Sequence, residues 1–223
     1  MTDFKDKVVL ITGAGRGAGR ALAKAFAARG AMVAANDISP VNLEEGVAQI
    51  QAKGGRAKAY VEDVAKKMGV QSIVKQVEDD FGSIDILINH ASVEPHVPLL
   101  DMDEWDWHRT LDVNLTGAFL MTQSVGRVMR TRSGGVIINL VTGAGGDGRE
   151  KRGAYAASIQ GLIGLTFQFA RELSPYGIHV HAVGKDISEF AHTDAVIPKS
   201  LVEAVFYLCV SDMNGQIVNI EEP

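Results

Sequence analysis

The sequence predicts an α/β fold: a doubly wound parallel sheet of about seven strands with helices on both faces. Two observations lead to this prediction. Short apolar runs alternate with helical patterns along the whole chain, and the runs are apolar throughout rather than at alternate positions, as is typical of strands buried on both faces. Glycine-rich segments follow several of the runs, at the edge of the sheet where such folds bind ligands.

Strands and helices are expected to alternate from end to end. The predicted strands are Val8–Thr12, Met32–Asn36, Ala57–Val61, Ile84–Asn89, Gly135–Leu140, His179–Val183 and Gln216–Ile220. The predicted helices are about Gly17–Arg29, Val41–Lys53, Lys66–Phe81, Met102–Arg130, Tyr155–Ser174 and Lys199–Val210. The 223 residues show neither a linker nor an internal repeat, so we interpret residues 1–223 as one domain.

The turn after the first strand is the strongest functional signal. The apolar run Val8–Thr12 ends in four closely spaced glycines, and an alanine-rich helix pattern follows at once. Glycines allow positive φ angles and let a ligand approach the backbone closely, while the helix N-terminus offers free N–H groups to a phosphate. The candidate phosphate-binding residues are Gly13, Gly15, Arg16, Gly17, Ala18 and Gly19.

The second strand ends at an acidic residue that indicates which dinucleotide binds. Asp37 lies 18 residues past Gly19, where a carboxylate can accept hydrogen bonds from an adenosine ribose. The same carboxylate would repel a 2′-phosphate, and the neighbouring Ile38 offers no positive charge to offset that repulsion. The sequence therefore favours NAD(H) over NADP(H), with Asp37 and Ile38 at the ribose.

Composition excludes several other classes of protein. A net charge of −5 without a block of Lys or Arg argues against nucleic-acid binding. No stretch approaches 18 apolar residues and no apolar signal region stands near Met1, so we expect a cytoplasmic protein without a membrane partner. Cys209 is the only cysteine, and we place it in the core. We expect no metal centre, because the histidines lack ligand spacing and we place His179 and His181 on opposite faces of their strand.

Several motifs together resemble the short-chain dehydrogenase/reductase family over nearly the whole chain. Thr12–Gly19 matches its cofactor turn, and Asp112–Gly117 matches the helix segment that carries its active-site asparagine. Asn89–Ser92 resembles its Asn-Asn-Ala-Gly motif, with His90 and Ser92 as departures. The resemblance implies a Rossmann-type domain that binds a nicotinamide dinucleotide. Its further implied contacts are Asp63, Val64, Asn89, His90 and Ala91, although His90 could also be an ordinary loop residue.

The resemblance also implies the catalytic residues. Tyr155 would be the acid or base, Thr142 occupies the family's serine position, and Asn114 supports them. The family places a lysine four residues after the tyrosine, on the same helix face, but this chain has Ile159 there. An unperturbed tyrosine has a pKa of about 10, so roughly one molecule in a thousand would be tyrosinate at pH 7. Tyr155 alone would therefore be a weak base.

Other basic residues lie near these positions in the sequence. Lys185 follows the sixth strand, where the family has a Pro-Gly pair near the nicotinamide, so it could supply the missing charge or be a solvated loop lysine. Lys151 and Arg152 precede Tyr155, and we expect the start of the helix to direct both outward. Only residues 187–198 remain of the family's substrate-covering segment, so we expect a shortened substrate loop and read no substrate identity.

Two functions are compatible with the sequence. The chain is either an oxidoreductase that transfers hydride between NAD(H) and an alcohol or carbonyl substrate at an impaired or altered site, or an inactive NAD-binding protein that acts as a sensor or structural partner. The resemblance further implies a homodimer or homotetramer formed through the helices around Gly117–Arg130 and Tyr155–Ser174. The alternative is that these faces only pack on the sheet.

Overall fold

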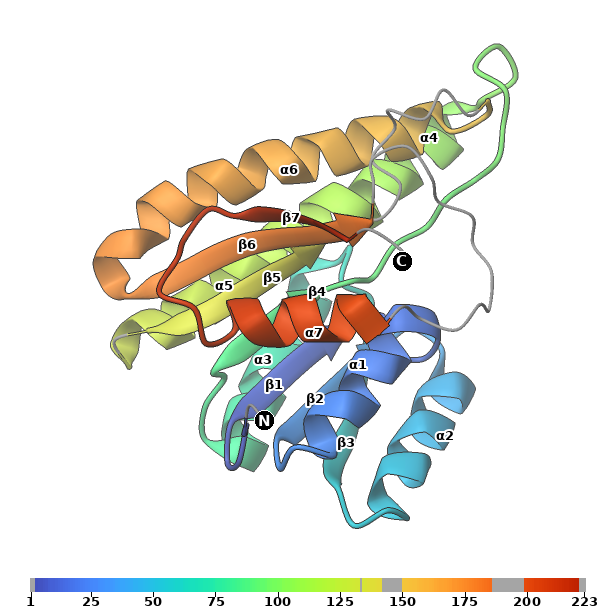
Figure 1. The fold of residues 1–223 in the computed structure, drawn as a ribbon. Helices are drawn as coiled ribbons and strands as arrows, with labels where there is room; N and C mark the ends of the chain where they lie inside the picture. The colour runs from blue at the N-terminus through green and yellow to red at the C-terminus, as the bar shows by residue number, and fades with distance from the viewer. Residues whose placement is uncertain (1–2, 133, 142–149, 186–198, 221–223) are drawn as a thin grey trace.

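The computed structural model describes residues 3–132, 134–141, 150–185 and 199–220, and it contains one seven-stranded sheet. Every strand pairing is parallel, in the order β3-β2-β1-β4-β5-β6-β7 (Figure 1). The strands are β1 (Val8–Thr12), β2 (Met32–Asp37), β3 (Arg56–Val61), β4 (Ile86–Asn89), β5 (Gly135–Leu140), β6 (Ile178–Lys185) and β7 (Ile217–Ile220). The chain reverses its direction of travel across the sheet between β1 and β4, the position where such sheets bind ligands.

Helices cover both faces of this sheet, as predicted. They are α1 (Gly17–Ala27), α2 (Pro40–Gln51), α3 (Lys67–Phe81), α4 (Glu104–Leu111), α5 (Ala118–Thr131), α6 (Gly153–Leu173) and α7 (Lys199–Leu208). A π-helical turn, η1 (Asp112–Gly117), joins α4 to α5, so the single long helix expected there is interrupted by a wider turn. A 3₁₀ turn, η2 (Ser174–Tyr176), follows α6.

Strand β1 shows why its sequence is apolar throughout. Val9 and Ile11 pack against the layer of α1, α2 and α7, whereas Val8 and Leu10 pack against the layer of α3, α5 and α6 (Figure 1). All four side chains are fully buried. Burial of each stabilises the fold by about 1.5–3 kcal/mol, so the sheet is a rigid support for the loops at its carboxyl edge.

The two histidines of β6 lie on one face of the strand, with ring centroids 6.4 Å apart. The prediction of opposite faces is wrong, because side chains alternate with a period of two and residues two apart share a face. His181 is fully buried; its Nδ1 accepts a hydrogen bond of 3.4 Å from the Gln216 amide, and its Nε2 has no partner within the described chain. Burial, and then the charge of His179, lower the pKa of His181 to about 4.

Two further features bear on the excluded classes of protein. In the described part of the chain, no helix is long and apolar enough to cross a membrane. Among the same residues, no three His, Cys, Asp or Glu side chains gather as potential metal ligands. Cys209 packs against the core cluster that contains α7, and burial raises the pKa of its thiol well above the usual range.

Candidate active site

The turn after β1 lies against the loop that follows β4. Gly13 has a φ of +67°, and a Cβ atom there would lie 2.9 Å from the Ala91 backbone. A Cβ on Gly19 would lie 2.3 Å from the Gly13 carbonyl oxygen. The Thr12 hydroxyl accepts hydrogen bonds from the amides of His90 (3.0 Å) and Ala91 (3.1 Å). The glycines are therefore required for close packing of the two loops that the sequence assigns to the cofactor.

The N-terminus of α1 fits a phosphate. Gly17, its first residue, has a φ of +53°, and a Cβ there would meet nothing within 4 Å. Arg16, immediately before it, gives the first turn no side-chain hydrogen bond among the described contacts. The first N–H groups of α1 thus have no side-chain cap among the described contacts, and uncapped N–H groups at a helix start suit an anionic group.

Asp37 is fixed at the carboxyl end of β2 by two backbone amides. Gly15 donates to its Oδ2 (2.9 Å) and Ser39 donates to its Oδ1 (2.9 Å). A Cβ on Gly15 would lie only 2.7 Å from Oδ2, so glycine is needed for the contact. The neighbouring Ile38 side chain is exposed. The carboxylate therefore lies beside the glycine turn, as the assignment to the ribose requires.

Asp63 and Val64 follow β3 in the sequence and contact the helical segment made of α4 and η1. The Asp63 carboxylate accepts hydrogen bonds from the Ala65 amide (2.9 Å) and from the Arg109 guanidinium of α4 (3.2 Å). Val64 is buried and packs on Gly117, where a Cβ would lie 3.1 Å from Val64 Cγ2. No sequence motif connects Arg109 to Asp63, 46 positions away, so sequence reasoning missed this arginine.

The side chain of Asn89 has a structural part in the site. It is buried, and its Nδ2 donates to Asn139 Oδ1 (2.8 Å) and Thr122 Oγ1 (3.2 Å). Asn139 in turn donates to Thr166 (2.9 Å). The amide thus ties β4 to β5, α5 and α6 rather than facing the loops. Any contact of Asn89 with the cofactor would therefore come from its backbone.

The predicted catalytic residues Asn114 and Tyr155 are joined through a third residue. Asn114 lies in η1; its Oδ1 accepts from the Val93 amide (2.8 Å) and its Nδ2 donates to the Val93 carbonyl (2.9 Å) and to Ser158 Oγ (3.0 Å). Ser158 donates to the Tyr155 carbonyl (2.7 Å). Ser158 was missed because its hydroxyl acts inside the helix, three residues after the tyrosine. π-Helical turns often mark functional sites, and this one holds Asn114 next to α6.

Ile159 occupies the lysine position with hydrocarbon. Its side chain is 2% exposed and belongs to an apolar cluster with Tyr155. The other buried members of this cluster are Ala118, Val141, Leu162 and Ala182. No charge or hydrogen bond can come from Ile159, so this route to a more acidic tyrosine is absent.

Arg152 does not point outward as expected. Its side chain is 6% exposed, forms an ion pair with Glu94, and places its guanidinium carbon 5.0 Å from the centroid of the Tyr155 ring. The reason is the position of the helix start: α6 begins at Gly153, and Arg152 has non-helical dihedral angles (φ −122°, ψ 21°). An outward direction assumed from helical geometry does not apply to a residue that precedes the helix.

Three parts of the predicted site fall outside the described residues. They are Thr142, the side chain of Lys185, and the shortened segment 187–198. The backbone of Lys185 is described and extends β6 beyond its predicted end, paired with Ile220.

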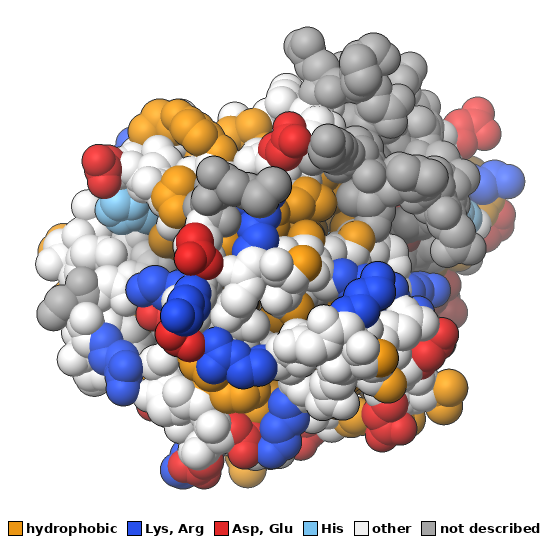
Figure 2. Space-filling view, turned by 60° about the horizontal axis from the view of Figure 1, so that its bottom comes forward, with side chains coloured by type: hydrophobic (Ala, Val, Ile, Leu, Met, Phe, Trp, Pro, Cys, Tyr) orange, Lys and Arg blue, Asp and Glu red, His pale blue; other side chains and the backbone are white. Residues whose placement is uncertain are grey.

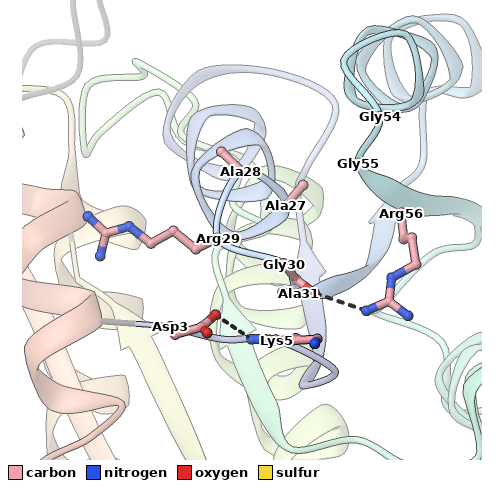
Figure 3. Close-up of a pocket in the computed structure, with 10 residues that line it drawn as sticks. All are labelled: Asp3, Lys5, Ala27, Ala28, Arg29, Gly30, Ala31, Gly54, Gly55 and Arg56. Atoms are coloured by element: carbon pink, nitrogen blue, oxygen red, sulfur yellow. Dashed lines mark hydrogen bonds between the residues drawn. The ribbon is translucent and has the colours of Figure 1, made fainter. Parts of the chain in front are cut away.

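A cavity of about 410 Å³ lies at the other end of the sheet, where the strands begin (Figure 3). It is lined by Asp3, Lys5, Ala27, Ala28, Arg29, Gly30, Ala31, Gly54, Gly55 and Arg56. None of the predicted site residues belongs to it. In Figure 2, which brings the bottom of the molecule forward, Lys and Arg side chains are interspersed with Asp and Glu rather than gathered in one stripe. This surface lacks the continuous basic stripe that marks a nucleic-acid footprint.

Comparisons with known proteins agree with this arrangement. The family model described as short chain dehydrogenase matches residues 7–196. An uncharacterized oxidoreductase of Thermotoga maritima is 42% identical over 81% of this chain and 71% of its own length. The D-threitol dehydrogenase of Mycolicibacterium smegmatis is 36% identical over 85% and 75%, respectively. The structure of an NAD⁺-bound xylitol dehydrogenase superposes with a TM-score of 0.86 at 30% identity, covering 97% of this chain and 98% of that chain. The chain belongs to the short-chain dehydrogenase family.

Proposed function

We propose that this protein is an NAD(H)-dependent oxidoreductase that transfers hydride between the nicotinamide and an alcohol or carbonyl substrate, at a catalytic site altered by Ile159. The observation that carries the proposal is the connected set Val93–Asn114–Ser158–Tyr155, in which every link is a hydrogen bond of 3.0 Å or less. The last link ends on the backbone carbonyl of Tyr155, so the set holds η1 and its Asn114 against the part of α6 that carries the tyrosine.

The cofactor residues support NAD(H). The glycine turn would bind the pyrophosphate at the start of α1, and Asp37 would accept hydrogen bonds from the adenosine ribose. The backbone amides of Gly15 and Ser39 donate to the carboxylate oxygens, so the negative charge is held beside the glycine turn, from where it would repel a 2′-phosphate. The NAD⁺ bound to the similar xylitol dehydrogenase is consistent with this choice.

Tyr155 would exchange the proton. The neutral phenol would donate its proton to the substrate oxygen during reduction and be left as tyrosinate, and the tyrosinate oxygen would accept the alcohol proton during oxidation. The nicotinamide, when bound, would supply or take the hydride. Thr142, at the family's serine position, would donate a hydrogen bond to the substrate oxygen. Two of the similar proteins are named for polyols, D-threitol and xylitol, so secondary alcohols and their ketones are the first substrates to screen.

The rival function is an inactive NAD-binding protein, and one observation favours it. Ile159 is buried among apolar side chains, so the place of the family lysine is closed to charge. Lys185, the last residue of β6, is a candidate source of that charge from its place in the sequence. A charge from Lys185 would favour the enzyme instead. Both functions require the cofactor turn and differ only in turnover.

We also propose that residues 1–223 act as one domain and that copies associate through α5 and α6. Phe119 of α5 and Phe169 of α6 stack at 6.4 Å, and the Phe167 side chain of α6 is half exposed. A hollow of about 280 Å³ lies between the same two helices. Arg127, Arg130 and Glu172 line this hollow together with the aromatic rings, so a two-fold contact with a second copy would join faces that are apolar and charged in part.

The test separates these proposals in two steps. Fluorescence titration with NADH and NADPH measures binding, and we expect NADH to bind in the micromolar range and NADPH more weakly. Turnover with NAD⁺ and a panel of polyols, or NADH and their ketones, then distinguishes the enzyme from the inactive protein. Binding without any turnover would favour the inactive protein, and absence of binding to either nucleotide would contradict both.

A further inference from the structure

The altered site retains a positive charge near its tyrosine. Arg152 precedes α6, and its guanidinium carbon lies 5.0 Å from the centroid of the Tyr155 ring. The lysine of the family would come from the opposite direction, one helical turn after Tyr155, where this chain has Ile159. Arg152 thus precedes Tyr155 in the sequence by three residues, and Ile159 follows it by four.

Glu94 holds the arginine in this position. The carboxylate comes from the loop after β4 and pairs with Arg152 Nε. The side chains are 2% and 6% exposed, respectively, so both charges are removed from water. Separation of a buried pair would leave each charge without compensation. The two side chains are therefore expected to stay in contact.

The position over the ring matters for the ionised form of tyrosine. A cation within about 6 Å of an aromatic face is attracted by the ring electrons. Tyrosinate carries additional negative charge, part of which is delocalised into the ring, so the attraction is stronger than for the neutral phenol. An opposite charge at this distance favours the charged form of a titratable group.

We propose that Arg152, held by Glu94, supplies the positive charge beside Tyr155 that Ile159 cannot supply, and that it makes Tyr155 competent as the acid or base. This inference rests on the proposed function of Tyr155. Arg152 acts on the tyrosine rather than on the substrate, so it is a positioning residue.

Two further groups lie near the ion pair and the ring. Glu94 opposes the effect of Arg152, because its negative charge disfavours tyrosinate. His96 Nε2 lies 3.9 Å from Glu94 Oε1, and the His96 side chain is mostly exposed. The hydrophobic cluster that contains Tyr155 also includes Leu115, Ala118, Ala182 and Ile217, from η1, α5, β6 and β7.

The two charged partners therefore make opposite predictions. Arg152→Gln should raise the pKa of Tyr155 by about one unit or more. Glu94→Gln keeps a side-chain oxygen that can accept from Arg152 Nε, so the arginine stays in place while the opposing negative charge is lost, and the pKa of Tyr155 should fall. If the pair only fastened the loop to the helix, both substitutions would loosen the same contact and move the pKa in the same direction. Arg152→Lys keeps the charge and should lie between the wild type and Arg152→Gln.

The experiment is an ultraviolet titration of tyrosinate between pH 8 and 12 in the protein without cofactor. The chain has four tyrosines, so each protein is measured against the same protein carrying Tyr155→Phe, and the difference belongs to Tyr155. Tyr60 stays silent, because burial and the Asp80 carboxylate raise its pKa far above the usual range. Circular dichroism at each pH confirms that the variants remain folded.

Opposite shifts for Arg152→Gln and Glu94→Gln would support the proposal, and shifts in one direction or none would overturn it. Should Arg152→Gln fail to fold, the Glu94→Gln and Arg152→Lys titrations still decide the sign. The readout needs neither substrate nor turnover. A shifted Tyr155 in a protein that never turns over would contradict the proposed function alone, and an unshifted Tyr155 in an active enzyme would contradict this inference alone.

Discussion

The Gly15 amide donates a hydrogen bond of 2.9 Å to Asp37 Oδ2, so the glycine turn and the acid at the end of β2 form one unit. The first prediction concerns this contact. Gly15→Ala would place a methyl group 2.7 Å from the carboxylate oxygen and must displace either the turn or Asp37. We expect NADH binding, measured by fluorescence titration, to weaken about tenfold or more, which corresponds to about 1.4 kcal/mol.

Gly164→Ala is the control: its Cβ would meet nothing within 4 Å, so affinity should not change. Equal affinities in all three proteins would argue against a role for the contact.

Cofactor preference should depend on the charge at Asp37 and Ile38. In the double variant Asp37→Ala, Ile38→Arg, the repelling carboxylate is removed and an exposed position gains a guanidinium that can pair with a 2′-phosphate. We expect the ratio of the NADPH and NADH dissociation constants to shift toward NADPH by about a hundredfold, since two charges change. Ile38→Arg alone should give a smaller shift. If the ratio stays at its wild-type value, the carboxylate does not set the preference.

Ile159→Lys tests whether the absent lysine is the principal defect. General acid–base catalysis contributes on the order of 10²–10⁴-fold. We expect kcat for alcohol oxidation at pH 8 to rise by about tenfold, a partial gain because Arg152 already places a positive charge beside Tyr155. Burial of the new side chain among apolar neighbours should lower the melting temperature at the same time. Ile163→Lys, one turn farther along α6, is the matched control and should not raise kcat. Unchanged turnover in folded Ile159→Lys would show that another part of the site limits the reaction.

Stability should fall in mild acid because of His181. Burial lowers the folded-state pKa of this histidine to about 4, whereas the unfolded chain binds the proton near pH 6.5. The unfolded state therefore binds more protons as the pH falls below about 6.5, and the free energy of unfolding should drop by about 2 kcal/mol between pH 7 and pH 5. Urea unfolding at both pH values measures this drop. His181→Gln should flatten the dependence relative to His179→Gln; equal slopes would assign the effect to other groups.

The sheet was predictable because its physical signature is local. Short and mostly apolar runs with glycine-rich segments after them indicate strands buried on two faces, and β1 and β5 begin and end where the pattern places them. The glycine turn and Asp37 were predictable for a related reason, since chain order alone brings the ends of β1 and β2 to one edge. The prediction that His179 and His181 lie on opposite faces misapplied the two-residue period of a strand. The sequence itself contained the information needed to place them on one face.

The contacts of the site were less accessible from sequence. Arg109 meets Asp63 across 46 positions, and Arg152 meets Glu94 across 58; no local pattern encodes either pair. The direction of Arg152 depends on the backbone angles just before a helix, where rotation by 100° per residue does not yet apply. The Asn89 side chain points into the core, where a buried amide needs hydrogen-bond partners. Those partners, Asn139 and Thr122, come from β5 and α5, so the sequence around Asn89 does not reveal them.

The π-helical turn η1 has a consequence for the whole rod from α4 to α5. Such a turn is an ordinary helix with one residue added, and each residue of an α-helix advances the side chains by about 100°. Arg109 before the turn and Met121 after it are therefore out of the phase that an uninterrupted helix would give. Removal of a single residue from Asp112–Gly117 would leave a continuous α-helix, whose two halves could no longer face Asp63 and the core at once. One inserted residue thus sets the angular offset between the cofactor end of this rod and its buried end.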